Sequence, residues 1–169
     1  MNFVRHKHIW HKGALLATLL FAYLSGSFSL AEGWSLKDKD GVRYTLSEQH
    51  GKWVLVNFWA PWCPPCIQEL PELVSLQKQH RNLQVLGVAV QYGTKQEVMD
   101  MVKSQSISYP IVLGNEDTAG DFGGLNGLPT SFLYSPSGKL VGHHDGPLTQ
   151  NEIEQAIEQK PEAGALFTR

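Results

Sequence analysis

Both cysteines of this 169-residue chain lie in one short motif, Trp62-Cys63-Pro64-Pro65-Cys66. A thiolate can attack one sulfur of a disulfide in another molecule, which gives a mixed disulfide. The two-residue spacer places the second thiol close enough to attack that mixed disulfide and release the product. The motif therefore predicts a centre for dithiol and disulfide exchange.

The segments on either side of the motif predict where the two thiols lie. Residues 53–59 have the length and the β-branched and aromatic content of a strand buried on both faces, and a helical pattern begins at Cys63. In a first helical turn, unpaired backbone N–H groups and the positive end of the helix dipole favour a thiolate. We therefore expect Cys63 to be the nucleophile and Cys66, one turn further, to be the resolving thiol.

Three other uses of the cysteines fit the sequence less well. A zinc site needs two further soft ligands, but there is no third cysteine, and His50, His80, His143 and His144 show no matching spacing. A purely structural disulfide would close too short a loop to restrict the unfolded chain much. A peroxidatic cysteine, as in peroxiredoxins, follows a threonine by three residues, and Ala60 stands there.

Composition places the chain among single-domain globular proteins. With 169 residues and 42% hydrophobic content it can bury a core without disulfide staples, which leaves the cysteines for chemistry. The net charge is −2, but all 16 acidic residues lie from Glu32 onward beside 11 basic ones, so residues 32–169 carry −5. This balance argues against a nucleic-acid partner.

Residues 1–31 have the order of a secretory signal. A basic segment without acidic residues is followed by an apolar segment over residues 14–24 and by small residues before Ala31. The apolar segment is short for a membrane span, which favours cleavage after Ala31, although an uncleaved anchor formed by residues 14–31 is the alternative. Either way, residues 32–160 are expected in the periplasm or on the outer face of the cytoplasmic membrane.

The first half of the exported part predicts a hairpin and a βαβ unit. Asp40-Gly41 is a turn signal for a hairpin over residues 34–46, which is expected to add an edge to the sheet. A helix over residues 63–80 should kink at Pro71, which lacks an N–H and clashes with the preceding turn. The apolar face of this helix is predicted to contain Ile67, Leu70 and Val74.

The remaining pattern completes an α/β fold. Residues 83–90 are a second apolar run and predict a strand parallel to residues 53–59. Capping boxes at Thr94 and Thr149 predict the starts of two further helices, the first ending near residue 104. The other predicted elements are a strand at 109–113, a short helix at 117–122, a hairpin of 130–134 with 140–144, and a disordered tail at 161–169.

The motif WAPWCPPC after an apolar strand, the Pro-kinked helix, and the later segment GLPTSFLYSPSGKLVG resemble the thioredoxin superfamily. Within it the chain is similar to the exported TlpA/ResA-like branch and to the thioredoxins of cytochrome c maturation. The resemblance covers about residues 34–159. It implies a three-layer α/β/α fold with a central mixed sheet and an N-terminal hairpin, and a cis Pro129 beside the disulfide that shapes the groove where the client chain pairs.

A proton acceptor for Cys66 is also needed. Thioredoxins usually place a buried aspartate six residues before the first cysteine, but Asn57 stands there and cannot accept the proton. Glu69 lies one helical turn after Cys66 and on the same face, and the ResA-like branch carries a glutamate at the matching place. We therefore predict Glu69 as the base, with burial raising its pKa; a solvated surface glutamate is the alternative.

The remaining predictions concern the client and the direction of exchange. Trp62, Leu128, Pro129 and Thr130 are expected to line the client-binding groove, whereas Trp59 is expected in the core. Pro64 and Pro65 offer no N–H groups to Cys63, which favours a less oxidising centre.

We therefore expect an exported thiol–disulfide oxidoreductase that reduces protein clients and is itself re-reduced by a membrane thiol donor. No cofactor is expected beyond the Cys63–Cys66 disulfide. The alternatives are a protein-disulfide oxidant and a copper-delivery module using Cys63, Cys66 and a histidine. We interpret His143 and His144 as part of an edge-strand surface.

Overall fold

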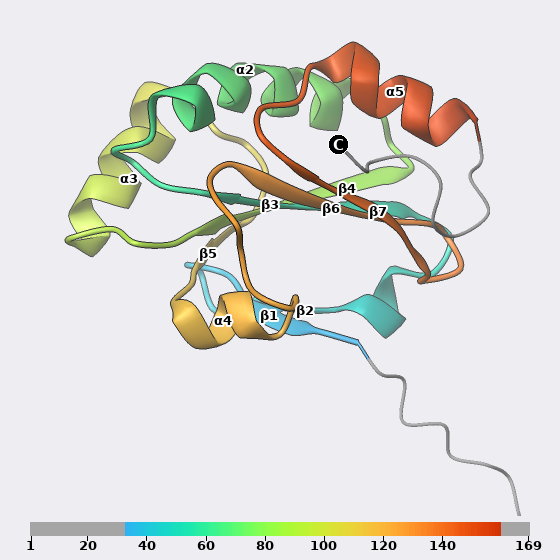
Figure 1. Cartoon of the computed structure of the whole chain (residues 1–169), viewed down its shortest axis with the longest axis horizontal. Coiled ribbons are helices and arrows are strands. Elements are labelled where there is room, and N and C mark those ends of the chain that lie inside the picture. Colours follow the sequence, from blue (N-terminus) through green and yellow to red (C-terminus); the bar gives the residue numbers. More distant parts are fainter. Residues whose placement is uncertain (1–32, 160–169) are drawn as a thin grey trace, which may run out of the picture. The chain divides into compact units, whose positions relative to one another are not determined.

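The computed structural model describes residues 33–159, which form a five-stranded mixed sheet covered on both faces (Figure 1). The signal or anchor predicted for residues 1–31 and the tail predicted for 161–169 lie outside these residues. Within residues 33–159, no helix is long and apolar enough to cross a membrane. The sheet has the order β5-β4-β3-β6-β7, formed by Ile111–Leu113, Leu83–Ala89, Trp53–Trp59, Thr130–Tyr134 and Leu140–Asp145.

Strand β3 is the central strand of the sheet and is buried along its whole length, with Asn57 as its one polar residue. It pairs parallel with β4, as predicted, and antiparallel with β6. β4 pairs parallel with β5, and β6 forms the predicted hairpin with the edge strand β7. Since side chains alternate between the faces of a strand, Asn57 shares its face with Leu55 and Trp59, opposite Phe58.

Three helices cover the face of the sheet to which Leu55 and Trp59 point. They are α2 (Pro64–Gln79), α3 (Lys95–Ser104) and α5 (Gln150–Glu158). The predicted capping box of α5 is complete, because Thr149 and Glu152 bond each other's backbone N–H groups. At α3, Thr94 accepts from the Glu97 N–H, but the Glu97 carboxylate accepts from the N–H of Gly93.

The buried stripe of α2 differs from the predicted one. Leu70 and Val74 are buried, but Ile67 is only partly so, and the fully buried positions include Cys66 and Glu69. Ile67 thus lies at the edge of the buried face, because the cysteine and the glutamate take its most inward positions. Pro71 lies inside α2, which runs on to Gln79, and the kink stays a prediction.

The N-terminal hairpin lies over the opposite face of the sheet. Its strands β1 (Ser35–Lys37) and β2 (Arg43–Thr45) form a separate two-stranded sheet. It meets β5 through one bridge, Asp38 with Val112, so the prediction that it adds an edge to the main sheet is wrong. The physical reason is that Trp34 and Leu36 are buried against this face, together with the 3₁₀ helix η1 (Leu46–Gln49) and α4 (Glu116–Gly120).

Candidate active site

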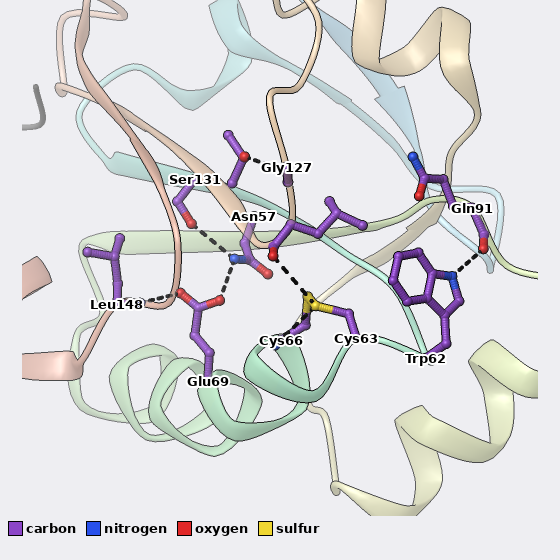
Figure 2. The surroundings of a disulfide bond; sticks show 11 residues. Asn57, Trp62, Cys63, Cys66, Glu69, Gln91, Gly127, Ser131 and Leu148 are labelled. Carbon is purple, nitrogen blue, oxygen red and sulfur yellow. Dashed lines mark hydrogen bonds between the residues drawn. A yellow bond between two sulfur atoms is a disulfide. The ribbon is translucent and has the colours of Figure 1, made fainter. Parts of the chain in front are cut away.

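Cys63 and Cys66 form a disulfide at the first turn of α2 (Figure 2). Their Cα atoms are 5.3 Å apart, and Cys63 is the N-cap residue, with extended backbone angles. The fixed backbone of Pro64 at the first helical position suits the start of a helix, and its missing N–H would have no partner there. The strand-to-helix junction predicted for the motif is therefore present.

The two sulfur atoms differ in their surroundings. Cys63 retains 3% of its surface and Cys66 retains none, so an attacking group can reach only the first cysteine. Because Pro64 and Pro65 have no N–H, the donor that the first turn offers to Cys63 Sγ is the N–H of Cys66, at 3.4 Å. This geometry agrees with Cys63 as the nucleophile and Cys66 as the resolving thiol.

Glu69 is buried one turn beyond Cys66 and is only 2% exposed. Among residues 33–159 it is the only buried carboxyl group. Its Oε1 accepts from the N–H of Leu148 at 2.9 Å, and its Oε2 accepts from Nδ2 of Asn57 at 2.9 Å. Burial raises the pKa of Glu69 from its ordinary 4.5 to about 7, although both hydrogen bonds lower it. The alternative of a solvated surface glutamate is thus excluded.

Asn57 supports this carboxylate from β3. Its Nδ2 also donates to Oγ of Ser131 at 3.0 Å, so one amide joins β3, β6 and α2 (Figure 2). An aspartate at this position would bring a second negative charge against Glu69 in a dry site, which is costly. The replacement of the usual aspartate by asparagine and the burial of Glu69 therefore belong together.

A cis peptide joins Leu128 to Pro129 beside the disulfide, as the resemblance implies. The carbonyl oxygen of Leu128 lies 3.7 Å from Cys63 Sγ. A disulfide sulfur has no hydrogen, so in the oxidised state this is a contact, and a reduced thiol could donate to the same oxygen. Pro129 is buried and accepts from the N–H of Gly146 at 2.8 Å, which ties the loop to the end of β7.

Thr130 faces inward rather than toward a groove. It is 1% exposed, and its hydroxyl lies 2.9 Å from the carbonyl oxygen of Gly127 and 2.9 Å from Oδ1 of Asp145. Hydrogen bonds from Asn126 and Thr130 keep the pKa of Asp145 below its ordinary value. The side chain of Thr130 therefore holds the proline loop in place.

Trp62 flanks the disulfide on the side away from Glu69 (Figure 2). Trp62 is 59% exposed, and its Nε1–H donates to the carbonyl oxygen of Gln91 at 2.7 Å. Gln91 has a φ of 51°, a left-handed conformation that is uncommon for residues other than glycine. A large apolar ring is thus held next to Cys63, whereas Trp59 is fully buried, as predicted.

The predicted edge-strand surface at His143 and His144 lies on β7, which is an edge strand. The ring of His143 stacks on Phe132, with the centroids 5.8 Å apart. Within the part of the chain that the structure describes, no group of three or more His, Cys, Asp or Glu side chains is placed to hold a metal ion.

Comparison with known proteins gives a family for this site. Residues 29–143 match the AhpC/TSA family. The chain is 36% identical over 146 residues to the thiol-disulfide oxidoreductase ResA of Bacillus subtilis, which covers 83% of this chain and 82% of ResA. The chain belongs to the AhpC/TSA family. It is a ResA-like thiol–disulfide oxidoreductase with a thioredoxin fold.

This ResA-like chain is also similar to a second ResA protein and to a solved structure. ResA of Halalkalibacterium halodurans is 31% identical over 174 residues, covering 94% of this chain and 99% of that protein. A crystal structure of a thiol:disulfide interchange protein of the thioredoxin family from Chlorobium tepidum TLS matches with a TM-score of 0.67 at 31% identity. That match covers 75% of this chain and 92% of the other.

The sequence did not predict the roles of several residues in the site of this ResA-like oxidoreductase. From the sequence, Asn57 is only a residue that cannot act as the base, although the alternation along β3 places it on the face that α2 covers. Leu148 and Gln91 contribute backbone atoms, for which the sequence carries no signal. Tyr109 is buried with an unpartnered hydroxyl, and burial and the nearby Glu69 carboxylate raise its pKa, so it stays neutral.

Proposed function

We propose that this oxidoreductase is exported and reduces disulfides in client proteins, with apocytochrome c as one candidate client. The observation that carries the proposal is the pairing of a disulfide at the start of α2 with a buried carboxyl group one turn on, whose pKa is raised to about 7. A group with that pKa can both accept and release a proton near neutral pH.

The reaction begins with the reduced enzyme. The Cys63 thiolate attacks one sulfur of the client disulfide, the client S–S bond breaks, and the second client sulfur leaves as a thiolate that takes up a proton. Cys66 then loses its proton, and its thiolate attacks the Cys63 sulfur of the mixed disulfide. The bond between Cys63 and the first client sulfur breaks, and that sulfur leaves as a thiolate. The client has gained two electrons, and the enzyme holds the Cys63–Cys66 disulfide seen in the structure.

Glu69 is the proposed acceptor of the Cys66 proton. It lies on the same buried face of α2, and Asn57 and the Leu148 N–H hold its two oxygens in fixed positions. The raised pKa means that the carboxylate takes the proton more readily than a solvated glutamate does. A nearby client thiolate or the next reductant removes it again.

The surroundings of Cys63 support the reducing direction. A strongly oxidising disulfide needs a reduced form whose thiolate is well stabilised. Here Pro64 and Pro65 supply no N–H, and the first turn gives Cys63 Sγ one donor, from Cys66. A less stabilised thiolate makes the dithiol the better electron donor.

The cycle requires re-reduction of the disulfide outside the cytoplasm. We propose a membrane thiol protein as the donor, because an exported domain meets an oxidising compartment. The basic and apolar order of residues 1–31 supports export, either with cleavage after Ala31 or with residues 14–31 kept as an anchor. The disulfide itself carries the two electrons, and no further cofactor is part of the proposal.

The test is to trap the exchange in cells. In a Cys66→Ala variant the mixed disulfide on Cys63 cannot be resolved, so clients stay attached and can be identified. In the wild type, we expect Cys63 and Cys66 to be mainly reduced at steady state, and the purified protein to reduce insulin without bound copper. A mainly oxidised pair would assign the chain as an oxidant. Tight copper(I) binding without reductase activity would assign a copper carrier.

A further inference from the structure

We propose that a pocket beside Trp62 binds an apolar side chain of the client, and that Glu116 in the pocket wall favours a cationic residue next to that side chain. This inference rests on the proposed function and narrows the class of client. The pocket has a volume of about 570 Å³ and lies where β4 and β5 end and α4 begins. Its wall contains apolar side chains from three segments, namely Val90, Tyr92, Ala119 and Leu125.

The pocket is continuous with the surface at which exchange occurs. Gln91 lines the pocket, and the carbonyl oxygen of the same residue accepts the Trp62 indole N–H at 2.7 Å. On another side, Leu125 precedes Leu128 by three residues, and the Leu128 carbonyl oxygen contacts Cys63 Sγ. The pocket therefore adjoins residues that flank or contact Cys63, and an extended client chain advances about 3.3 Å per residue toward it.

The charges around the pocket select among clients. Between Lys103 and Lys139 the sequence has three carboxylates, Glu116, Asp117 and Asp121, and no Lys, Arg or His. All three are exposed, and Glu116 lines the pocket itself. Because opposite charge speeds encounter and like charge repels, Glu116 in the pocket wall favours a client segment that carries Lys or Arg beside its apolar anchor.

An apolar side chain is the occupant that the interior fits. A pocket of this size with aromatic and aliphatic walls has ample room for a large side chain, and removing that side chain's surface from water supplies affinity. The polar side chains of the lining, Gln91, Asn115 and Glu116, can hydrogen-bond the peptide backbone of the client. A client with a small residue in the pocket and an acidic residue beside it would gain neither the burial of apolar surface nor the attraction between opposite charges.

The experiment compares two-cysteine peptides that differ at one position near the disulfide, carrying Leu-Arg, Ala-Arg, Leu-Asp or Ala-Asp. The reference substrate is bis(2-hydroxyethyl) disulfide, which is too small to use the pocket. We expect the peptide-to-reference ratio of kcat/KM for Leu-Arg to exceed that for Ala-Asp by about tenfold or more in the wild type. Ala119→Leu should remove the preference for Leu, and Glu116→Lys should remove the preference for Arg.

A matched control is Glu158→Lys, because Glu158 is an exposed carboxylate on α5, outside the pocket lining. It should keep both preferences. Equal ratios for all four peptides in the wild type, or unchanged preferences in both pocket variants, would overturn the inference.

Loss of reduction of even the reference disulfide would instead contradict the proposed function. In that case the pocket is tested by calorimetry, in which the oxidised protein is titrated with the same four peptides after both cysteines are replaced by serine. Tighter binding of the Leu-Arg peptide that is lost in Ala119→Leu supports the pocket, and equal binding of all peptides rejects it.

Discussion

The disulfide has two sides that differ in burial and chemistry (Figure 2). On one side Asn57, Glu69 and Ser131 form a buried polar group, in which each hydrogen bond joins parts of the chain far apart in sequence. On the other side Trp62 is exposed and held by a single hydrogen bond to Gln91. The dry side can shift a pKa and move a proton, and the exposed side can contact a client.

One pair of sulfur atoms therefore depends on two separable sets of residues. A change on the buried side should alter both stability and proton transfer, because those groups hold the fold together and control one charge. A change on the exposed side should alter recognition and leave stability nearly unchanged. The following predictions test that separation.

The largest effect is expected for Glu69→Gln. Without a proton acceptor, release of the mixed disulfide on Cys63 should slow by about 100-fold or more, the range for loss of a general base. The rise of the resolution rate with pH near 7 should disappear as well, since the pKa of Glu69 is about 7. Single-turnover kinetics between pH 5 and 9 measure both quantities.

The control is Glu72→Gln, one turn further along α2, where the side chain is exposed. That variant should keep the wild-type rate and pH profile. If Glu69→Gln and Glu72→Gln resolve the mixed disulfide equally fast, Glu69 is not the base.

Stability should depend on pH through the same carboxyl group. The pKa of Glu69 is raised in the fold, so the native state holds this proton more tightly than the unfolded chain does. Its contribution is therefore fully present below pH 4.5 and is lost as the pH rises to about 7. At about 1.4 kcal/mol per pKa unit the loss is about 3 kcal/mol.

Denaturant unfolding of the oxidised protein from pH 4 to 8 measures this loss as the difference between wild type and Glu69→Gln. The variant has no titrating group at position 69, so the other carboxyl groups cancel in the comparison. Parallel stability curves for the two proteins would mean that the pKa of Glu69 is not raised.

A smaller effect is expected for Trp62→Ala on the exposed side. Reduction of protein clients should fall about tenfold in kcat/KM, because an exposed aromatic anchor is lost. The free energy of unfolding should change by less than about 0.5 kcal/mol, since the ring is 59% exposed. Steady-state kinetics with insulin and urea unfolding test the two parts.

Trp62→Phe separates the ring from its hydrogen bond to Gln91, because it keeps an aromatic face and loses the N–H. It should recover most of the client activity. A large loss of stability in Trp62→Ala would show that the two sides of the disulfide are not separable.

The smallest effect is expected for Thr130→Val, which removes the hydroxyl that holds the proline loop to Asp145. Losing this hydrogen bond should cost about 1 kcal/mol of unfolding free energy. Urea unfolding measures it, with Ser137→Ala as the control, because that hydroxyl is exposed in a turn. An equal effect of both changes would mean that the Thr130 hydroxyl does not hold the loop.

Much of the fold was readable from the sequence because its signals are local. The apolar runs gave β3 and β4 and their parallel pairing, and the capping boxes located the starts of α3 and α5. The hairpin was predicted by its Asp40-Gly41 turn, but its place over the face of the sheet was not. The position of the hairpin depends on which apolar side chains pack against Trp34 and Leu36, and these come from many parts of the core.

By itself the sequence determined the exchange chemistry, because two thiols, two prolines and a strand-to-helix junction occupy one short segment. It also pointed to Glu69 by helical spacing. Only the tertiary structure decided that Glu69 is buried and hydrogen-bonded by Asn57 and Leu148. It also decided that Gln91, which accepts the Trp62 hydrogen bond, lines a pocket. The physical reason is that burial and backbone hydrogen bonds depend on segments up to about 80 residues apart, which no local pattern encodes.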